Sequence, residues 1–116
     1  MKRGEVRTAT VPTMDGSTPK SRPVLVVQSD FYNQRISNVI LAAITSNLSR
    51  VNDNSHLLID ISTADGQASG LKSNSLVSCI NLIVLPQASV HRKIGELSAA
   101  LMQQVDDCLK HALELP

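Results

Sequence analysis

Apolar and polar residues alternate along the chain in short runs, most of them too short to form helices. The runs at 23–27 and 38–45 are rich in Val, Ile and Leu, which is typical of strands buried on both faces. Further strands are predicted at 5–11, at 56–61 and, as one or two strands, at 75–85. The polar segments between them predict loops at 12–21, 29–37 and 62–70, and Pro23 fits only as the first residue of its strand.

Beyond Pro86 the pattern changes to a helical period. Ser98 is a suitable N-cap for a C-terminal helix, whose apolar positions are Leu101, Val105, Cys108, Leu109 and Ala112. The strands lack the intervening helices that a parallel sheet would require. The sequence therefore predicts a mainly β domain spanning 1–116, a small antiparallel barrel that is closed or flanked by a terminal helix.

Composition narrows the possible partners of the chain. Its 116 residues are 42% apolar and 18% charged, which is typical of a globular protein. The formal net charge is +1, so a nucleic-acid groove would have to be a local feature. The chain has no Trp and only one Phe and one Tyr, Phe31 and Tyr32, which offer little surface for base stacking. A core this thin favours sharing apolar surface with a second copy, so we expect a homodimer.

The cysteines and histidines do not suggest a metal site or a cofactor. Cys79 and Cys108 lie within apolar runs and predict buried thiols. The three histidines, at positions 56, 91 and 111, are scattered and are interpreted as structural or surface residues. No apolar segment follows the N-terminus and no run approaches the length of a membrane span, which predicts a cytoplasmic protein without membrane contact.

Four segments resemble, in order, motifs of the MazF/PemK toxins. These are K-R-G-E-V at 2–6, S-R-P-V-L-V-V-Q-S-D at 21–30, A-A-I-T-S at 42–46 and, more weakly, G-L-K-S-N-S-L-V at 70–77. The resemblance implies an SH3-like barrel with a C-terminal helix, a homodimer and a cognate antitoxin of a type II toxin–antitoxin system. It also implies an mRNA interferase, an endoribonuclease that cuts single-stranded RNA through the substrate's own 2′-hydroxyl and without a metal.

The resemblance also assigns residues to this chemistry. Arg22 matches the catalytic arginine of the family, and a guanidinium suits phosphate oxygens because it is planar and always charged. Thr45 matches the catalytic threonine, whose hydroxyl can donate to a phosphate oxygen. The RNA-binding residues implied are Ser17, Thr18, Lys20, Ser46 and Asn81. Without the resemblance, Arg22 would be read as a solvated side chain and Thr45 as an ordinary strand residue.

Some positions depart from the family pattern and keep other functions open. Ser17 stands where the family commonly has an acidic residue, and the stretch 81–83 replaces a common Q-x-R, which removes a cation. One alternative is a non-enzymatic, CcdB-like poison, because 27–30 reads V-Q-S-D. Against it, the chain ends L-E-L-P at 113–116 rather than in Trp-Gly-Ile. Another alternative is a degenerate toxin that retains only dimerisation and antitoxin binding.

Overall fold

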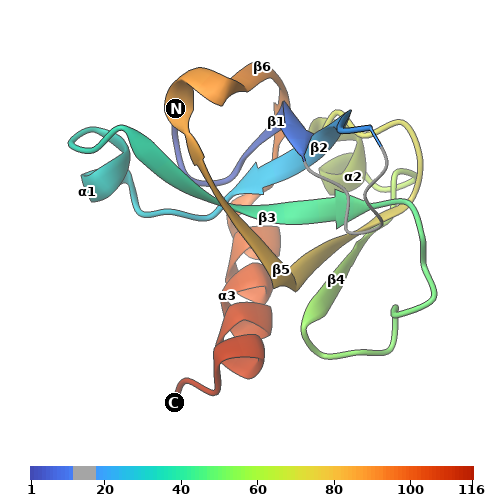
Figure 1. The fold of residues 1–116 in the computed structure, drawn as a ribbon. Helices are drawn as coiled ribbons and strands as arrows, with labels where there is room; N and C mark the ends of the chain where they lie inside the picture. The colour runs from blue at the N-terminus through green and yellow to red at the C-terminus, as the bar shows by residue number, and fades with distance from the viewer. Residues whose placement is uncertain (12–17) are drawn as a thin grey trace.

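The computed structural model describes residues 1–11 and 18–116, and over these residues the mainly β architecture with a C-terminal helix is confirmed. Six strands form one antiparallel sheet in the order β4-β5-β3-β2-β1-β6 (Figure 1). The strands are β1 (Glu5–Val11), β2 (Lys20–Val26), β3 (Asn38–Thr45), β4 (His56–Ile59), β5 (Ser75–Pro86) and β6 (Val90–Glu96). The helices are α1 (Asp30–Asn33), α2 (Ala64–Ala68), α3 (Ala99–Leu113) and the 3-10 turn η1 (Gln87–Ser89).

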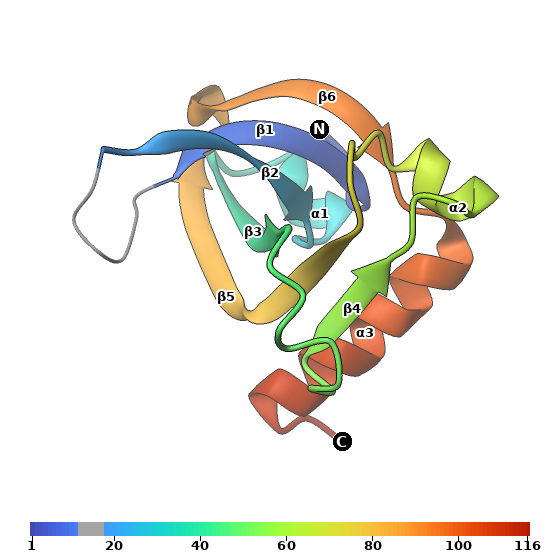
Figure 2. The ribbon, with the colours of Figure 1, turned by 90° about the vertical axis from the view of Figure 1, so that its right-hand side faces the viewer.

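The sheet is strongly curled and barrel-like, with α3 lying alongside β4 and β5 (Figure 2). Over the described residues, β4 and β6 are the two edges of the sheet, and no strand pairing joins them. Beside β6, the backbone at 69–70 packs closely against the backbone at 94–95. A Cβ atom on Gly70 would collide with the carbonyl of Ile94, and one on Gly95 would collide with the backbone of Ser69. Gly70 also has a φ of +75°, so its place in the 70–77 motif follows from steric need.

The core lies on both faces of this sheet. One cluster joins Leu25 and Ile44 to Val105 and Cys108 of α3, and a second gathers Val24, Val26, Val39 and Leu41 on the other face. α3 begins as predicted, since the Ser98 side chain accepts a hydrogen bond from the Leu101 N–H. Both faces are therefore buried over the second half of β2, as its apolar run predicts, whereas the first half of β2 and Ile40 of β3 remain exposed.

The prediction that Pro23 begins its strand was wrong. β2 starts at Lys20, and Pro23 lies inside it opposite Thr8 of β1. Pairing of β2 with β3 begins only at Val24, opposite Ala43. The first half of β2 therefore has a single neighbouring strand, where the missing N–H of a proline can be tolerated. The predicted loop 12–21 ends two residues too late for the same reason.

Three further elements were missed by the sequence patterns. Strand β6 was not predicted, because its run V-H-R-K-I-G-E is mostly polar and exposed at a sheet edge. Helices α1 and α2 lie within segments predicted to be loops, and each is only about one turn long. Thr63 caps α2 by accepting from the Gly66 N–H. Periodicity cannot detect a single helical turn, since it needs several turns to repeat.

A sharp bend divides β5, which is one strand and not two. Ala42 of β3 pairs with Leu82, whereas the next residue, Ala43, pairs with Ser78. Residues 79–81 therefore have no partner on β3, and the strand bulges at this point. The bend is visible in Figures 1 and 2. It turns the Asn81 side chain toward the end of β3, where the candidate site lies.

Candidate functional site

Arg22 and Thr45 lie at the same end of two adjacent strands: Arg22 is near the start of β2, and Thr45 is the last residue of β3. Val24 and Ala43 are cross-strand partners, and Arg22 and Thr45 lie two residues further along their own strands in the same antiparallel register. Residues two apart on a strand point to the same face, so both side chains leave the same face of neighbouring strands. Arg22 is exposed and Thr45 is half-buried. Extended by two residues, this register would bring the two residues opposite each other, but pairing of β2 with β3 stops at Val24, and the two side chains line different pockets.

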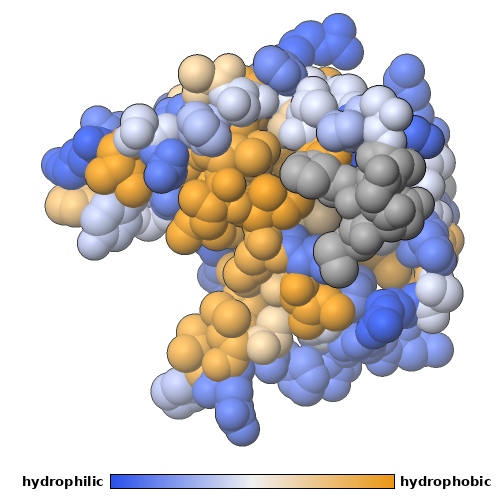
Figure 3. Space-filling view, in the orientation of Figure 1, coloured by the Kyte–Doolittle hydropathy of each residue, from blue (hydrophilic) through white to orange (hydrophobic). Residues whose placement is uncertain are grey.

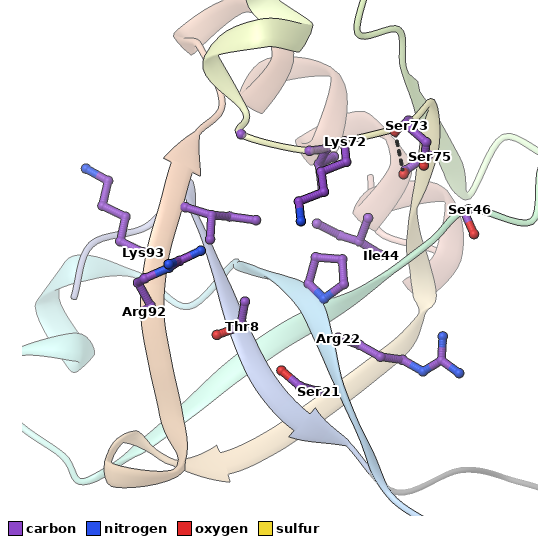
Figure 4. A pocket seen from close by; sticks show the side chains of 14 residues that line it. Thr8, Ser21, Arg22, Ile44, Ser46, Lys72, Ser73, Ser75, Arg92 and Lys93 are labelled. Carbon is purple, nitrogen blue, oxygen red and sulfur yellow. Dashed lines mark hydrogen bonds between the residues drawn. The ribbon is translucent and has the colours of Figure 1, made fainter.

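A pocket of about 660 Å³, here called the Arg22 pocket, opens beside β2. Its wall contains Arg22, Ser46, Lys72 and Arg92, and Ile44 contributes an apolar surface. Lys72 extends into this hollow from the segment before β5, whereas the Arg22 side chain extends toward the side on which β5 lies (Figure 4). The size suits a nucleotide-sized ligand, and cations at its rim suit a phosphate.

Three of the four cations that line this pocket lack an acidic partner among the described residues; the fourth, Lys93, lies 3.7 Å from Glu5 and 3.6 Å from Glu96. Arg3, Arg7 and Lys93 are paired with Asp106 or Glu5. Within the described chain, no ion pair joins an acidic side chain to Arg22, Lys72 or Arg92, nor to Lys20, two residues before Arg22 in β2. Local positive charge therefore gathers at this edge of the sheet despite a net charge of only +1.

A smaller pocket of about 200 Å³, here called the Thr45 pocket, lies beside the end of β3. Thr45, Arg50, His56, Ser78 and Asn81 are among its lining residues. The Oγ1 atom of Thr45 accepts a hydrogen bond from the Asn47 N–H at 3.1 Å. Since that bond uses a lone pair, the hydroxyl proton is left to donate to a phosphate oxygen.

His56 agrees with the structural alternative of the sequence analysis, but its position beside Thr45 was not predicted. His56 is buried and lines the Thr45 pocket, with Nε2 at 3.0 Å from Ser78 Oγ and Nδ1 at 3.2 Å from Ser55 Oγ. The other two histidines, at 91 and 111, are exposed as expected. Neither His56 nor Ser78 belongs to a recognisable motif. Their placement depends on the β4–β5 register, which pairs the two residues and which no sequence pattern specifies.

The remaining residues assigned to RNA binding are distributed around the two pockets. Ser46 lines the Arg22 pocket and Asn81 lines the Thr45 pocket. Lys20 and Thr18 are exposed near the start of β2. Ser17 lies outside the described residues. Ser46 thus shares a pocket with Arg22 and Asn81 shares one with Thr45, whereas Thr18 and Lys20 line neither pocket.

The two cysteines are free and buried, as predicted, and burial raises the pKa of the Cys79 thiol to about 12. In the described part of the chain, no group of three or more His, Cys, Asp or Glu side chains could hold a metal ion. No helix of the described residues has the length and apolar character to cross a membrane.

Comparison with known proteins assigns the family. Residues 2–113 match the model of the PemK-like, MazF-like toxins of type II toxin–antitoxin systems. The chain belongs to this family. The endoribonuclease MazF6 of Mycobacterium tuberculosis, a relative within it, is 35% identical over 115 residues, which cover 97% of this chain and 96% of MazF6. The predicted recognition is therefore confirmed.

Solved structures of the family share the fold. The M. tuberculosis toxin MazF-mt6 aligns with a TM-score of 0.78 at 25% identity, over 97% of this chain and 98% of that toxin. An endoribonuclease of a mycobacterial species, solved in complex with its cognate antitoxin, aligns with a TM-score of 0.78 at 19% identity, over 100% of this chain and 97% of that one. The antiparallel, barrel-like sheet with a terminal helix is thus the MazF fold.

Proposed function

We propose that this toxin is an endoribonuclease that cleaves single-stranded RNA without a metal, acting as one domain in the cytoplasm. The observation that supports the proposal is the β2–β3 register, in which Val24 pairs with Ala43, so that Arg22 and Thr45 lie at the same end of two adjacent strands. Relatives named endoribonucleases, which cover nearly the whole chain, support the same activity.

In the proposed reaction, the 2′-oxygen of a ribose attacks the adjacent phosphorus and the bond from phosphorus to the 5′-oxygen breaks. The proton leaves the 2′-hydroxyl and the departing 5′-oxygen gains one, which yields a 2′,3′-cyclic phosphate and a 5′-hydroxyl. Negative charge grows on the non-bridging oxygens during this step. Arg22 would neutralise that charge, and the Thr45 hydroxyl would donate one hydrogen bond and hold the phosphate in line for attack.

The Arg22 pocket provides a path for the rest of the strand. Lys20, Lys72 and Arg92 lie within or near it and have no acidic partner among the described residues. Phosphates flanking the scissile bond would bind there. Because such contacts release counterions, RNA binding should weaken as salt rises.

We further propose a homodimer that pairs through an apolar face over β3 and β5. Figure 3 shows apolar surface gathered over these strands beside α1 and again near the end of α3. Ile40 and Val84 are cross-strand partners that both point to solvent, with Val84 61% exposed. Ile80 and Leu113 are exposed as well. An apolar patch of this kind on a small protein is typical of an interface between copies.

A cognate antitoxin is the second proposed partner. The complex solved for the mycobacterial relative supports it, as does membership of a toxin–antitoxin family. The unpaired cations of the Arg22 pocket would attract an acidic antitoxin segment as well as RNA. An antitoxin that covered this pocket would block cleavage by excluding the substrate.

Incubation of the purified protein with a long RNA tests the proposal. Cleavage products with the predicted ends support an endoribonuclease. A folded dimer that binds antitoxin but leaves every RNA intact would instead favour the degenerate toxin. Inhibition of DNA gyrase without RNA cleavage would favour a CcdB-like poison, but no feature of the described site supports that activity.

A further inference from the structure

A chain of hydrogen bonds connects the Thr45 pocket to Asp53, in the segment that precedes β4. It starts at Asn81, whose Nδ2 donates to Ser78 Oγ at 2.8 Å, and Ser78 Oγ lies 3.0 Å from His56 Nε2. His56 Nδ1 lies 3.2 Å from Ser55 Oγ, which donates to Asp53 Oδ1 at 2.7 Å. The chain therefore links an exposed amide at the candidate site to a carboxylate through a buried histidine.

The direction of every hydrogen bond in this chain follows from its acidic end. Asp53 Oδ1 accepts from the Ser55 backbone N–H at 2.9 Å and from the Ser55 hydroxyl at 2.7 Å, and these two bonds lower the pKa of its carboxyl. With its proton given to Asp53, Ser55 Oγ accepts from the Nδ1–H of His56. His56 Nε2 then carries no proton and accepts from Ser78, which leaves Ser78 Oγ to accept from Asn81.

The inner members of the chain are held firmly in place. His56, Ser78 and Ser55 are buried, with exposed fractions of 8%, 1% and 2%. The Cys79 N–H donates to the Ser55 carbonyl at 2.9 Å, which fixes the start of the β5 bulge to the same segment. Asn81, at the end of the bulge, is exposed to solvent, and Asp53, at the other end of the chain of hydrogen bonds, is half-buried.

This arrangement permits one orientation of the Asn81 amide. Turning the carboxamide by half a circle would place Oδ1 against Ser78 Oγ, whose proton is already donated to His56. Two oxygen lone pairs would then face each other. Nδ2 therefore points inward, and Oδ1 remains as the acceptor beside the Thr45 pocket.

We propose that Ser78 and His56 are positioning residues that fix Asn81 Oδ1 as an acceptor for the amino group of an RNA base bound beside Thr45. Adenine and cytosine present such an amino group, whereas uracil presents a carbonyl oxygen at the corresponding place. Asn81 thus selects an amino-bearing base against uracil at one position near the cleaved bond. This inference rests on the proposed RNA cleavage and adds the source of its base selection.

The first arm of the test uses the folded protein without RNA and is independent of activity. Nitrogen-15 NMR of His56 should show Nδ1 protonated and Nε2 unprotonated at neutral pH. The opposite tautomer, or a doubly protonated ring, would overturn the proposal. The second arm maps cleavage ends on a long RNA and then measures single-turnover rates on oligonucleotide pairs that differ only between an amino-bearing base and uracil.

The wild type should prefer the amino-bearing base about fivefold or more at one position, the lower end of what a base-edge contact supplies. Asn81→Ala, Ser78→Ala and His56→Phe should each reduce that preference to less than about twofold at that same position only. Ser69→Ala is the matched control, because Ser69 is fully buried and its hydroxyl donates to the Gly66 carbonyl. Neither residue belongs to the chain of hydrogen bonds from Asn81 to Asp53. The Ser69→Ala substitution should lower thermal stability and leave selection unchanged.

The outcomes distinguish this inference from the proposed function. A wild type that cleaves no RNA would overturn the proposed function, and base selection would fall with it. Cleavage with the wild-type preference retained in folded Ser78→Ala and His56→Phe would overturn this inference alone. Equal loss of selection at every position, in the control as well, would identify a general loss of structure and would also count against it.

Discussion

Replacing Arg22 with alanine should abolish cleavage and leave the fold intact. The side chain is exposed and forms no ion pair with an acidic side chain of the described residues, so its removal should change the free energy of unfolding by only about ±0.5 kcal/mol. In the reaction it would be a fixed donor to a developing anion. Loss of such a donor costs about 2.7–4 kcal/mol, which is a reduction in rate on the order of a hundred- to a thousandfold.

The assay measures single-turnover cleavage and thermal unfolding on the same preparations. Arg22→Lys should also cleave poorly, since an ammonium cannot reproduce the planar fork of a guanidinium. Thr45→Ala should be milder, by about 0.5–1.5 kcal/mol, because it deletes one neutral donor. Lys110→Ala is the charge-matched control, since Lys110 is an exposed cation near the end of α3.

Two results would refute this reasoning. If Arg22→Ala cleaves within a few-fold of the wild type, the arginine is not the group that stabilises the transition state. If the variant unfolds while Lys110→Ala does not, Arg22 is needed for the structure. In that case, loss of cleavage would say nothing about its chemistry.

Three other perturbations test the fold and its assembly. Gly70→Ala should lower the melting temperature by several degrees, since the new Cβ meets the Ile94 carbonyl at a φ of +75°, a strain of about 1–3 kcal/mol; an unchanged melting curve would refute the close backbone packing beside β6. Val84→Lys should convert the dimer into a folded monomer in sedimentation experiments, and a persistent dimer would mean that another face is used. Burial raises the pKa of Glu5, but the Lys2 N–H and Arg7 outweigh it and lower the pKa below the ordinary 4.5. Ionised Glu5 therefore stabilises the fold above pH 4.5, and this contribution is lost as the pH falls through the lowered value. Glu5→Gln should flatten that part of the stability–pH curve, which urea unfolding measures.

The elements that sequence patterns predicted correctly are those with long apolar runs or clear caps. β3 was predicted at its observed bounds because eight successive residues suit a strand buried on both faces. The start of α3 was predicted from Ser98 because capping is local chemistry. β6 was missed because an edge strand has little apolar signal, and Pro23 was misplaced because its tolerance depends on where β3 stops pairing.

The residues of the candidate site also fall into two groups, those that the sequence indicated and those that only the structure revealed. Arg22 and Thr45 were assigned by resemblance, and the β2–β3 register puts them at the same end of these two strands. His56 and Ser78 could not be found from the sequence. Their relation depends on β4–β5 pairing and on the bulge at 79–81, both of which arise from tertiary packing. Sequence motifs indicated the residues proposed to touch the phosphate. The residues proposed to orient the Asn81 side chain could be identified only from the structure.

The most direct test of the central claim is the chemistry of the cleaved ends. Purified protein and a long RNA are incubated in excess EDTA, and the termini are then analysed by their ability to be ligated or phosphorylated. We expect cleavage that is unaffected by EDTA and yields 2′,3′-cyclic phosphate and 5′-hydroxyl ends. Cleavage that disappears in EDTA and returns with magnesium, or that leaves 3′-hydroxyl and 5′-phosphate ends, would contradict attack by the 2′-hydroxyl at the Arg22–Thr45 edge.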